Sequence, residues 1–340
     1  MFSPPPLRFV LSLLLSLSLC ACLLVPQNRE IAITLLPLTA PFDDPDLEYS
    51  ALTWCGDKLL MVPQFPERHV TGGYAQFYTL SKSAILDAID DPDTARLTPT
   101  PLPLKEGTIR SIPTKFEGYE AAICDDTQVW LTIEGVNKLG HHQAWLVRGH
   151  RTGTDHQESI ELDDLSVVSL SSYSKIHNMS EEAIVKIGND ILSMHEINDV
   201  RLGSPSQAYR YAPHNRSLST VAFPNLPYRI TDSTTADQLG RFWVINYLYS
   251  GDDFSREGRD PLGAQYGIGK THQINYNVER LVEFQYSDAG IQRVKRPPIQ
   301  LKLEGREGRN WEGIARLDDL GFLLITDRYP TTLLGFVPYP

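Results

Sequence analysis

Hydrophobic and polar positions along the chain follow one recurring pattern: a short strand-like stretch, a tight polar turn and a second strand-like stretch. Five copies of this hairpin pattern begin at Ser50, Glu120, Glu182, Asp232 and Glu312. Their turns, among them CGDK, GND and DDLG, contain the Gly, Asp and Asn residues that hairpin loops favour. Helical periodicity is almost absent from the body of the chain, so the pattern predicts a succession of β-hairpins.

Further strand-like stretches follow the hairpins and bring each repeat to four strands. After the third hairpin they read QAYRYAP and LSTVAFP, and after the fourth VERLVEFQYS and IQRVKRPPIQLKL. The first repeat is less regular, because its last stretch, 99–113, is rich in proline and poorly strand-like. Repeats of four strands predict an all-β fold of the β-propeller type.

The fifth repeat lacks one strand, since only TTLLGFVPYP follows its hairpin. The stretch IAITLLPL at 31–38, ahead of the first repeat, is the natural donor of the missing strand. Such a strand would close the ring and cover the exposed edge of the last blade. We therefore expect five blades closed by an N-terminal strand. Six blades are the alternative, with 85–115 or 250–285 forming a degenerate blade.

The first segment has the layout of an export signal. Arg8 precedes an apolar run over 9–25, which is short for a membrane span, and no acid occurs before Glu30. The motif LCAC resembles a bacterial lipobox with Cys22 as the lipid acceptor, while simple cleavage and a retained anchor are the alternatives. We expect three parts: a signal peptide over 1–22, a linker over 23–29 and a single propeller domain over 30–340.

Composition and charge narrow the classes of partner. The chain has 340 residues, of which 41% are hydrophobic, enough to bury a core. Its 42 acidic and 31 basic side chains give a formal net charge of −11, whereas nucleic acids need the opposite balance. We expect no nucleic-acid partner, contact with a membrane only through a lipid anchor, and a monomer that is either anchored in the cell envelope or secreted.

Acidic residues stand at both ends of the hairpins. In a propeller the inner strand of each blade lies along the axis and the second strand runs back, so starts and ends share one mouth. Carboxylates that converge there repel one another unless they are protonated or bind a cation. Oxygen-only ligands suit Ca²⁺, so we expect an axial Ca²⁺ site. Its expected ligands are the residues at the hairpin starts, Ser50, Glu120, Glu182, Asp232 and Glu312. The residues at the hairpin ends, which share the same mouth, are Gln64, Glu134, Glu196, Asn246 and Asp327. The alternative is that water and backbone N–H groups satisfy these side chains, some of them protonated.

Basic residues flank both sets of acids in the sequence. Cations beyond a carboxylate-held divalent ion are what an anionic group such as phosphate would meet. The alternative is that they form ion pairs with the acids and need no ligand. The residues expected to bind an anionic small molecule are Arg110, His177, Arg229, Arg309, Arg328 and Lys270.

Two further features concern a loop and the cysteines. The loop over 247–273 is long and rich in Gly and charge, and we interpret it as a lid over the mouth. Cys55 and Cys124 hold matching places in neighbouring repeats, but matching places need not bring two Cα atoms within the ~7 Å that a disulfide requires. We expect two buried free thiols.

The hairpin phrases YEAAICDDTQVWLTIE and NWEGIARLDDLGFLLITDRY resemble blades of secreted phytase-like and esterase-like propellers. The order of the five hairpin starts is also similar to that of the calcium-activated nucleotidases (apyrases), five-bladed propellers in which a Ser/Glu ring holds Ca²⁺ beside nucleotide phosphates. Ser50, Glu120, Glu182 and Glu312 match that ring in residue type, whereas Asp232 stands where the family has Ser.

These observations lead to a hypothesis about function. We expect an exported propeller whose axial Ca²⁺ helps to bind, and to hydrolyse, a phosphorylated small molecule, with Glu134 or Glu196 activating water. Two alternatives stay open: a non-catalytic propeller that binds a ligand or partner in the envelope, and a lactonase-like or esterase-like hydrolase.

Overall fold

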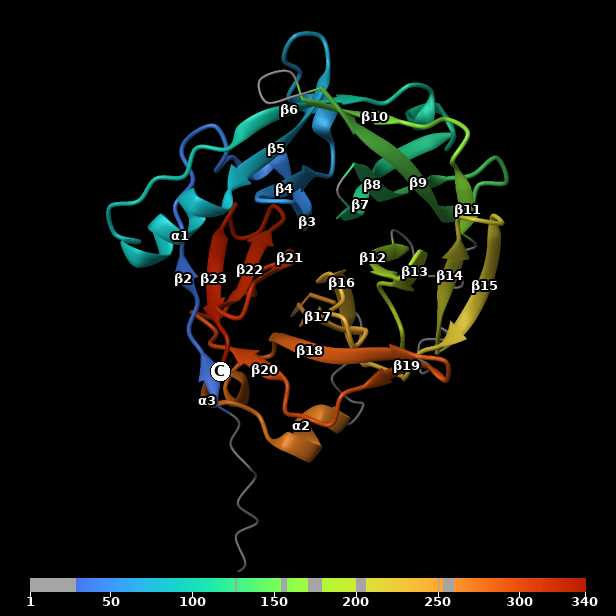
Figure 1. Ribbon diagram of the computed structural model, residues 1–340. Helices are drawn as coiled ribbons and strands as arrows, with labels where there is room; N and C mark the ends of the chain where they lie inside the picture. Colours follow the sequence, from blue (N-terminus) through green and yellow to red (C-terminus); the bar gives the residue numbers. More distant parts are fainter. Residues whose placement is uncertain are drawn as a thin grey trace, which may run out of the picture.

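Strand pairing assembles five blades around a central axis (Figure 1). The computed structural model describes residues 29–125, 127–153, 158–170, 179–199, 206–249, 251–252 and 260–340. The innermost strands of successive blades contact one another in a closed circle, β3 with β7, then β12, β16 and β21, and back to β3. The structure is therefore the five-bladed propeller that the hairpin repeats predict.

Blades 1 and 2 share one continuous sheet, because their outer strands β6 and β10 pair in parallel. Blade 1 contains β3 (Tyr49–Cys55), β4 (Lys58–Pro63), β5 (Ala75–Ser81) and β6 (Thr100–Lys105). Blade 2 contains β7 (Lys115–Asp125), β8 (Gln128–Val136), β9 (His142–Thr152) and β10 (Ser159–Leu162), with β11 (Val168–Leu170) also paired to β9.

The other three blades follow the same plan. Blade 3 contains β12 (Glu181–Ile187), β13 (Asp190–His195), β14 (Gln207–Ala212) and β15 (Ser217–Ala222). Blade 4 contains β16 (Arg229–Ser233), β17 (Arg241–Leu248), β18 (Val278–Ser287), β19 (Gly290–Arg293) and β20 (Ile299–Leu301). Blade 5 contains β21 (Trp311–Leu317), β22 (Gly321–Thr326) and β23 (Leu334–Pro338).

The ring is closed by the N-terminal segment, as the missing strand in the fifth repeat predicts. The short strand β2 (Thr34–Leu35) pairs antiparallel with β23, and the Leu36 N–H donates to the Leu334 carbonyl at 2.8 Å. The preceding strand β1 (Glu30–Ile31) pairs with β20 of blade 4. The segment therefore joins two neighbouring blades at their outer edges.

The sequence pattern is wrong about the proline-rich stretch. Within 99–113, β6 forms the outer strand of blade 1 and pairs with β5 on one side and β10 on the other, in spite of Pro101 and Pro103. Because proline lacks an N–H, it is tolerated where a strand has few ladder bonds to make. β6 has only two paired residues on its β10 side, Leu104 and Lys105, and both follow the prolines.

Helices are few and short among the described residues. They are α1 (Lys82–Asp90), α2 (Pro261–Tyr266), α3 (Lys270–Gln273) and three single 3₁₀ turns over Pro45–Leu47, Pro66–Arg68 and Ile109–Ser111. Within the described part of the chain, no helix has the length and apolar character needed to cross a bilayer.

Of the lid predicted over 247–273, residues 250 and 253–259 lie outside the described residues, and the described segment over 260–273 packs against blade 4. It contains α2 and α3, and Leu262 of α2 is buried in the hydrophobic core with Phe284 and Ile291 of blade 4. The Asp260 side chain caps α2 and accepts hydrogen bonds from Arg280 of β18. This part of the loop is therefore packed onto the outer strands of blade 4.

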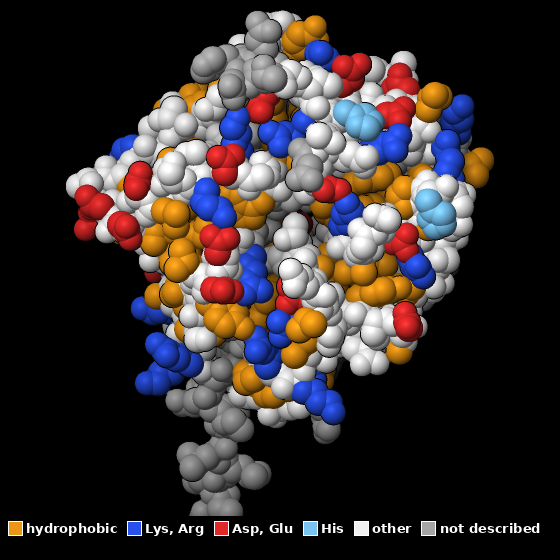
Figure 2. Space-filling view, in the orientation of Figure 1, with side chains coloured by type: hydrophobic (Ala, Val, Ile, Leu, Met, Phe, Trp, Pro, Cys, Tyr) orange, Lys and Arg blue, Asp and Glu red, His pale blue; other side chains and the backbone are white. Residues whose placement is uncertain are grey.

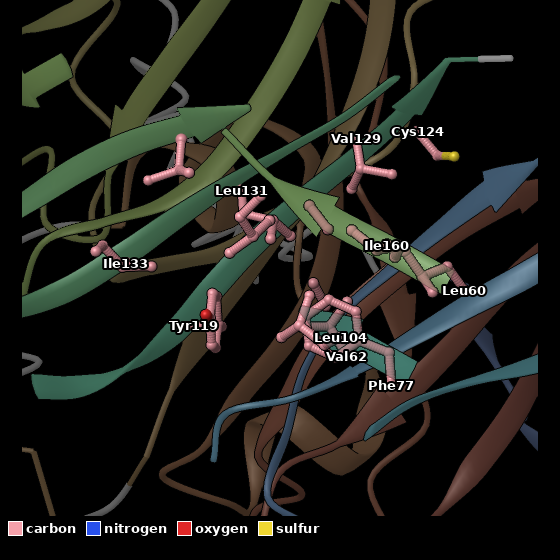
Figure 3. Packing of buried hydrophobic residues seen from close by; sticks show 14 of the residues in the cluster. Leu60, Val62, Phe77, Leu104, Tyr119, Cys124, Val129, Leu131, Ile133 and Ile160 are labelled. Atoms are coloured by element: carbon pink, nitrogen blue, oxygen red, sulfur yellow. The ribbon is translucent and has the colours of Figure 1, made fainter. Parts of the chain in front are cut away.

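A continuous apolar layer fills the space between blades 1 and 2. Figure 3 shows Leu60, Val62 and Phe77 of blade 1 facing Tyr119 and Leu131 of blade 2 across this layer. Cys55 and Cys124 belong to the same layer, and they form a disulfide with a Cα–Cα distance of 5.1 Å. The expectation of two free thiols is wrong, because both cysteines lie near the ends of inner strands that are neighbours around the axis.

Candidate functional site

A β-bulge presents one residue of each inner strand toward the mouth. In β3, Tyr49 pairs with Pro63 and Ala51 pairs with Val62, which leaves Ser50 as an extra residue in the ladder. The same irregularity occurs at Glu120, Glu182 and Glu312. Because a bulge re-aims a side chain, four equivalent bulges bring these residues together although they come from four blades.

Blade 4 continues this ring with Thr231 and not with the expected Asp232. Ile230 pairs with Asn246 and Ser233 with Val244, so both Thr231 and Asp232 face a single residue of β17. Thr231 Oγ1 donates to the Trp311 carbonyl at 2.7 Å, as Ser50 Oγ donates to the Tyr119 carbonyl at 2.6 Å. Each acceptor directly precedes the ring residue of the next blade. The ring therefore consists of Ser50, Glu120, Glu182, Thr231 and Glu312.

Asp232 has a different environment from the ring carboxylates. It is completely buried and accepts backbone N–H groups from Ser233 at 2.7 Å, Ile314 at 2.7 Å and Leu52 at 3.3 Å. Leu52 and Ile314 lie on the inner strands of blades 1 and 5. Burial raises the pKa of Asp232 well above its usual value, and these three hydrogen bonds act against that rise. Its carboxylate connects three inner strands.

Six carboxyl groups from blades 2, 3 and 5 gather at the mouth: Glu120, Glu134, Glu182, Glu196, Glu312 and Asp327. Burial raises the pKa of every one of them, and repulsion from neighbouring carboxylates adds to the rise. The pKa of Glu134 reaches about 8 and that of Asp327 about 6. The acids at hairpin starts and ends therefore interact, as the sequence predicts.

Several oxygen atoms of this acidic group have no hydrogen-bond partner. Glu134 Oε1 and Glu196 Oε2 are buried and unpaired. Glu120 has one amide donor, since Gln64 Nε2 donates to its Oε1 at 3.0 Å. Gly118 makes room for this contact, because a Cβ there would lie 2.7 Å from Glu120 Oε1 and 2.3 Å from Gln64 Cγ. Unpaired carboxylate oxygens that lie close together are the ligands that a hard divalent cation binds.

Glu181 is an acid that the sequence analysis did not select. It is 1% exposed, both of its carboxyl oxygens lack a hydrogen-bond partner, and burial raises its pKa to about 8. It also contributes to the raised pKa of Glu134. The signal in the sequence is the Glu-Glu pair at 181–182, of which only the second residue matches the repeat.

Four of the expected substrate-binding cations form ion pairs with acids: Arg110, Arg229, Arg309 and Arg328. Arg229 Nη1 lies 2.6 Å from Glu196 Oε1, and its Nη2 lies 2.5 Å from Asp252 Oδ1. Arg328 contacts Glu48 at 2.8 Å, and Arg110 contacts Glu67 at 2.8 Å. These residues therefore form the ion pairs that the alternative interpretation expected. Among them, only Arg229 pairs directly with one of the six acids at the mouth.

Of the remaining cations, Arg309 pairs with an acid outside that group, Lys270 begins a helix beside β1, and His177 lies outside the described residues. Arg309 is buried, with Nε and Nη2 on Glu279 at 3.0 and 2.8 Å and Nη2 also on the Lys302 carbonyl at 2.7 Å. Lys270 begins α3, whose next residue, Thr271, binds Glu30 of the outer strand β1. His177, Cys22 and the signal segment lie outside the described residues.

Surface charge gives a contrast to the acidic mouth. Figure 2 shows Lys and Arg side chains interspersed with Asp and Glu side chains over one face of the molecule. Opposite charges in such an arrangement screen one another. Of the six acids at the mouth, Glu196 has a direct guanidinium partner, Arg229.

No family model and no curated protein matches the chain by sequence. Among solved structures, the soluble aldose sugar dehydrogenase of Escherichia coli is similar over 90% of this chain and 99% of its own, with 10% identity and a TM-score of 0.42. A glucose dehydrogenase covers 91% and 99%, with 10% identity and a TM-score of 0.47. An endo-arabinanase of Bacillus licheniformis covers 89% and 97%, with 11% identity and a TM-score of 0.45.

Likenesses at this identity and TM-score carry no argument about activity. The propeller assignment rests on the strand pairing and on the closed circle of inner strands. The resemblance to calcium-activated nucleotidases and to phytase-like propellers stays a prediction.

Proposed function

We propose that the protein is an exported propeller that binds a divalent cation, Ca²⁺, at its axis and hydrolyses a phosphorylated small molecule there. The convergence of six carboxyl groups with raised pKa values, three of them buried and three half-buried, carries this proposal. Glu120, Glu182 and Glu312 would hold the ion, with the hydroxyl oxygens of Ser50 and Thr231 beside them. Such a set offers only oxygen atoms, which Ca²⁺ prefers.

Export is supported by the disulfide between Cys55 and Cys124, because disulfides persist in oxidising compartments. The proposed location is the cell envelope, through a lipid on Cys22, or the secreted fraction. Mass spectrometry of the mature protein would separate these two, since lipidation leaves a diacylglyceryl-modified Cys22 as the first residue.

The chain's own groups supply a proton acceptor and a place for an anion. A bound calcium ion would neutralise phosphate oxygens and favour ionisation of the acids around it. Glu134 and Glu196 each keep one unpaired oxygen and stand at the ends of the second strands, so either can take a proton from an attacking water. Arg229, held between Glu196 and Asp252, fixes the orientation of Glu196.

A second candidate function is non-catalytic binding of a ligand or partner at the same mouth. The observation in its favour is that Arg110, Arg229, Arg309 and Arg328 are already engaged in ion pairs, so a phosphate group would have to compete with acids for each of them. The two functions differ in turnover, and only hydrolysis depends on the cation.

Thermal melts with Ca²⁺ and with chelator, combined with a phosphate-release screen over nucleotides and phytate, test the proposal. We expect Ca²⁺ at 100 times its Kd to stabilise the protein by about 2.7 kcal/mol. Glu182→Gln should abolish this gain and phosphate release together. The matched control is Glu304→Gln, an exposed glutamate away from the mouth, which should behave as the wild type.

Two results would contradict the proposal in different ways. A melting temperature that does not change with Ca²⁺ would contradict the axial ion and the metal-assisted hydrolysis. Melts that respond to Ca²⁺, with no phosphate released from any substrate, remove hydrolysis and leave the binding propeller.

A further inference from the structure

Three neighbouring strands of blade 2 place two glutamates and a histidine on one side of the sheet. Glu134 lies near the end of β8 and faces Ala144 of β9, and His142 stands two residues before Ala144. Since residues two apart share a face of a strand, His142 and Glu134 lie on the same side. Glu117 of β7 joins them, because β7 has a second bulge between Phe116 and Gly118 that re-aims its side chain.

This second bulge is an additional irregularity of blade 2. Among the described hairpins, the pairing of β3, β12, β16 and β21 with their partners shows one irregularity each, near the ring residue, whereas β7 shows two. The extra bulge adds nothing to the axial ring, which Glu120 already joins. Its result is the approach of Glu117 to Glu134 and His142.

The ligand-type atoms of the three side chains are close enough to surround one ion. One atom from each of Glu117, Glu134 and His142 lies within 4.8 Å of the other two. His142 Nδ1 is 2.8 Å from Glu117 Oε2, and Lys115 Nζ is 2.7 Å from Glu117 Oε1. Glu134 is 1% exposed, and its Oε1 has no hydrogen-bond partner. A buried carboxylate oxygen without a partner is costly, so this position favours a cation.

We propose that Glu117, Glu134 and His142 form a second metal site, which takes a transition-type divalent cation of the Zn²⁺ class. One imidazole nitrogen and carboxylate oxygens are ligands that Zn²⁺ accepts, whereas Ca²⁺ prefers oxygen alone. Three protein ligands leave a coordination position open for water or a ligand. The Lys115 side chain is 70% exposed, so its ammonium can move from Glu117 into solvent when an ion binds.

This site does not depend on the axial Ca²⁺, although Glu134 stands between the two. Burial is the largest cause of the raised pKa of Glu134, and repulsion from Glu196 and from Glu117 adds to it. Glu134 therefore lies near the acidic mouth and near Glu117. With Glu134 as a ligand of the second ion, Glu196 is the carboxylate left to accept a proton in the proposed hydrolysis.

Calorimetric titration of tag-free, disulfide-bonded protein with Zn²⁺, in a buffer that keeps Ca²⁺ in excess, tests the site. We expect one Zn²⁺ per chain. His142→Ala should weaken binding at least tenfold, and so should Glu117→Gln, which keeps the shape of the side chain. His141→Ala is the matched control, since His141 is the exposed neighbour, and it should leave the affinity within twofold.

Absorption of the Co²⁺-substituted protein gives a second readout, because d–d bands report nitrogen and oxygen ligation directly and should disappear in His142→Ala. Thermal melts of each variant establish that it is folded, and Glu117→Gln carries the test if His142→Ala is not. Absence of Zn²⁺ binding, equal loss in the two histidine variants, or unchanged affinity in Glu117→Gln would overturn the proposal. Failure of the axial Ca²⁺ to bind leaves these readouts unaffected, so the two proposals fail separately.

Discussion

At the scale of single residues, buried carboxylates near the axis have two different environments. The oxygens of Asp232 are occupied by three backbone N–H groups, whereas Glu134 and Glu181 keep oxygens without partners. A carboxylate that is satisfied by backbone donors belongs to the scaffold. A carboxylate that is left unpaired in a group of like charges is available to a cation or a proton.

Replacement of Asp232 tests its role in the scaffold. Asp232→Ala leaves three buried N–H groups of blades 1, 4 and 5 without an acceptor, and each such group costs about 1–3 kcal/mol. We expect the free energy of unfolding, measured by urea denaturation, to fall by at least about 3 kcal/mol. The exposed Asp288→Ala should change it by less than about 0.5 kcal/mol. Equal effects of the two variants would assign Asp232 no such role.

At the scale of strands and hairpins, the recurring strand–turn–strand pattern predicts the blades well, because the first two strands of a blade are buried between its neighbours and must be apolar along most of their length. The position of the ring in blade 4 could not be predicted in this way. The bulge in β16 sets two residues, Thr231 and Asp232, against one residue of β17, and the hairpin pattern does not show which of the two faces the mouth. Charge made Asp232 the more conspicuous candidate, although the hydroxyl of Thr231 occupies the place equivalent to Ser50.

Contacts between residues far apart in the sequence were harder to predict, because the repeating pattern does not specify them. The two cysteines lie 69 residues apart, and only the circular arrangement of inner strands brings their Cα atoms to 5.1 Å. The ion pairs of Arg110 and Arg328 also depend on loop conformations that carry no period. The sequence indicated which residues are polar at the mouth, but not which of them bind one another.

The disulfide between β3 and β7 should stabilise the first two blades. Closing a loop of this length reduces the entropy of the unfolded chain, which corresponds to a free energy of about 4 kcal/mol at 25 °C. We therefore expect the Cys55→Ser, Cys124→Ser double variant to lose about 2–4 kcal/mol in guanidinium denaturation. A reducing agent should produce a similar loss in the wild type and none in the double variant. An unchanged midpoint in both experiments would contradict a stabilising role.

At the scale of the whole molecule, closure of the ring depends on the N-terminal segment. Leu36 is 1% exposed and packs in the core between blades 1 and 5, while its neighbour Leu35 is 42% exposed. Leu36→Ala should lower the free energy of unfolding by about 2–5 kcal/mol, because it opens a cavity at the closure. Leu35→Ala, on the same segment, should cost less than about 0.5 kcal/mol. Similar costs in chemical denaturation would show that closure does not depend on this contact.

The acidic mouth makes the stability of the whole ring depend on pH and on the cation together. The unfolded chain releases the Glu and Asp protons near pH 4, whereas in the folded protein the pKa of Asp327 is about 6 and those of Glu134 and Glu181 are about 8. Between these values the folded state binds more protons than the unfolded state, so its stability decreases as pH rises. This contribution is complete below pH 4 and is lost as pH rises through 6 and then 8.

In chelator we therefore expect a lower melting temperature at pH 8.5 than at pH 5.5. Saturating Ca²⁺ should raise the value at pH 8.5 more than the value at pH 5.5, because the ion binds the ionised carboxylates that protons otherwise neutralise. Glu134→Gln should flatten the pH dependence in chelator, since it removes one of the titrating groups, whereas the exposed Glu304→Gln should leave it unchanged. A metal-free protein that becomes more stable toward pH 8.5 would show that the mouth acids are already ionised and balanced, which leaves a cation no electrostatic reason to bind there.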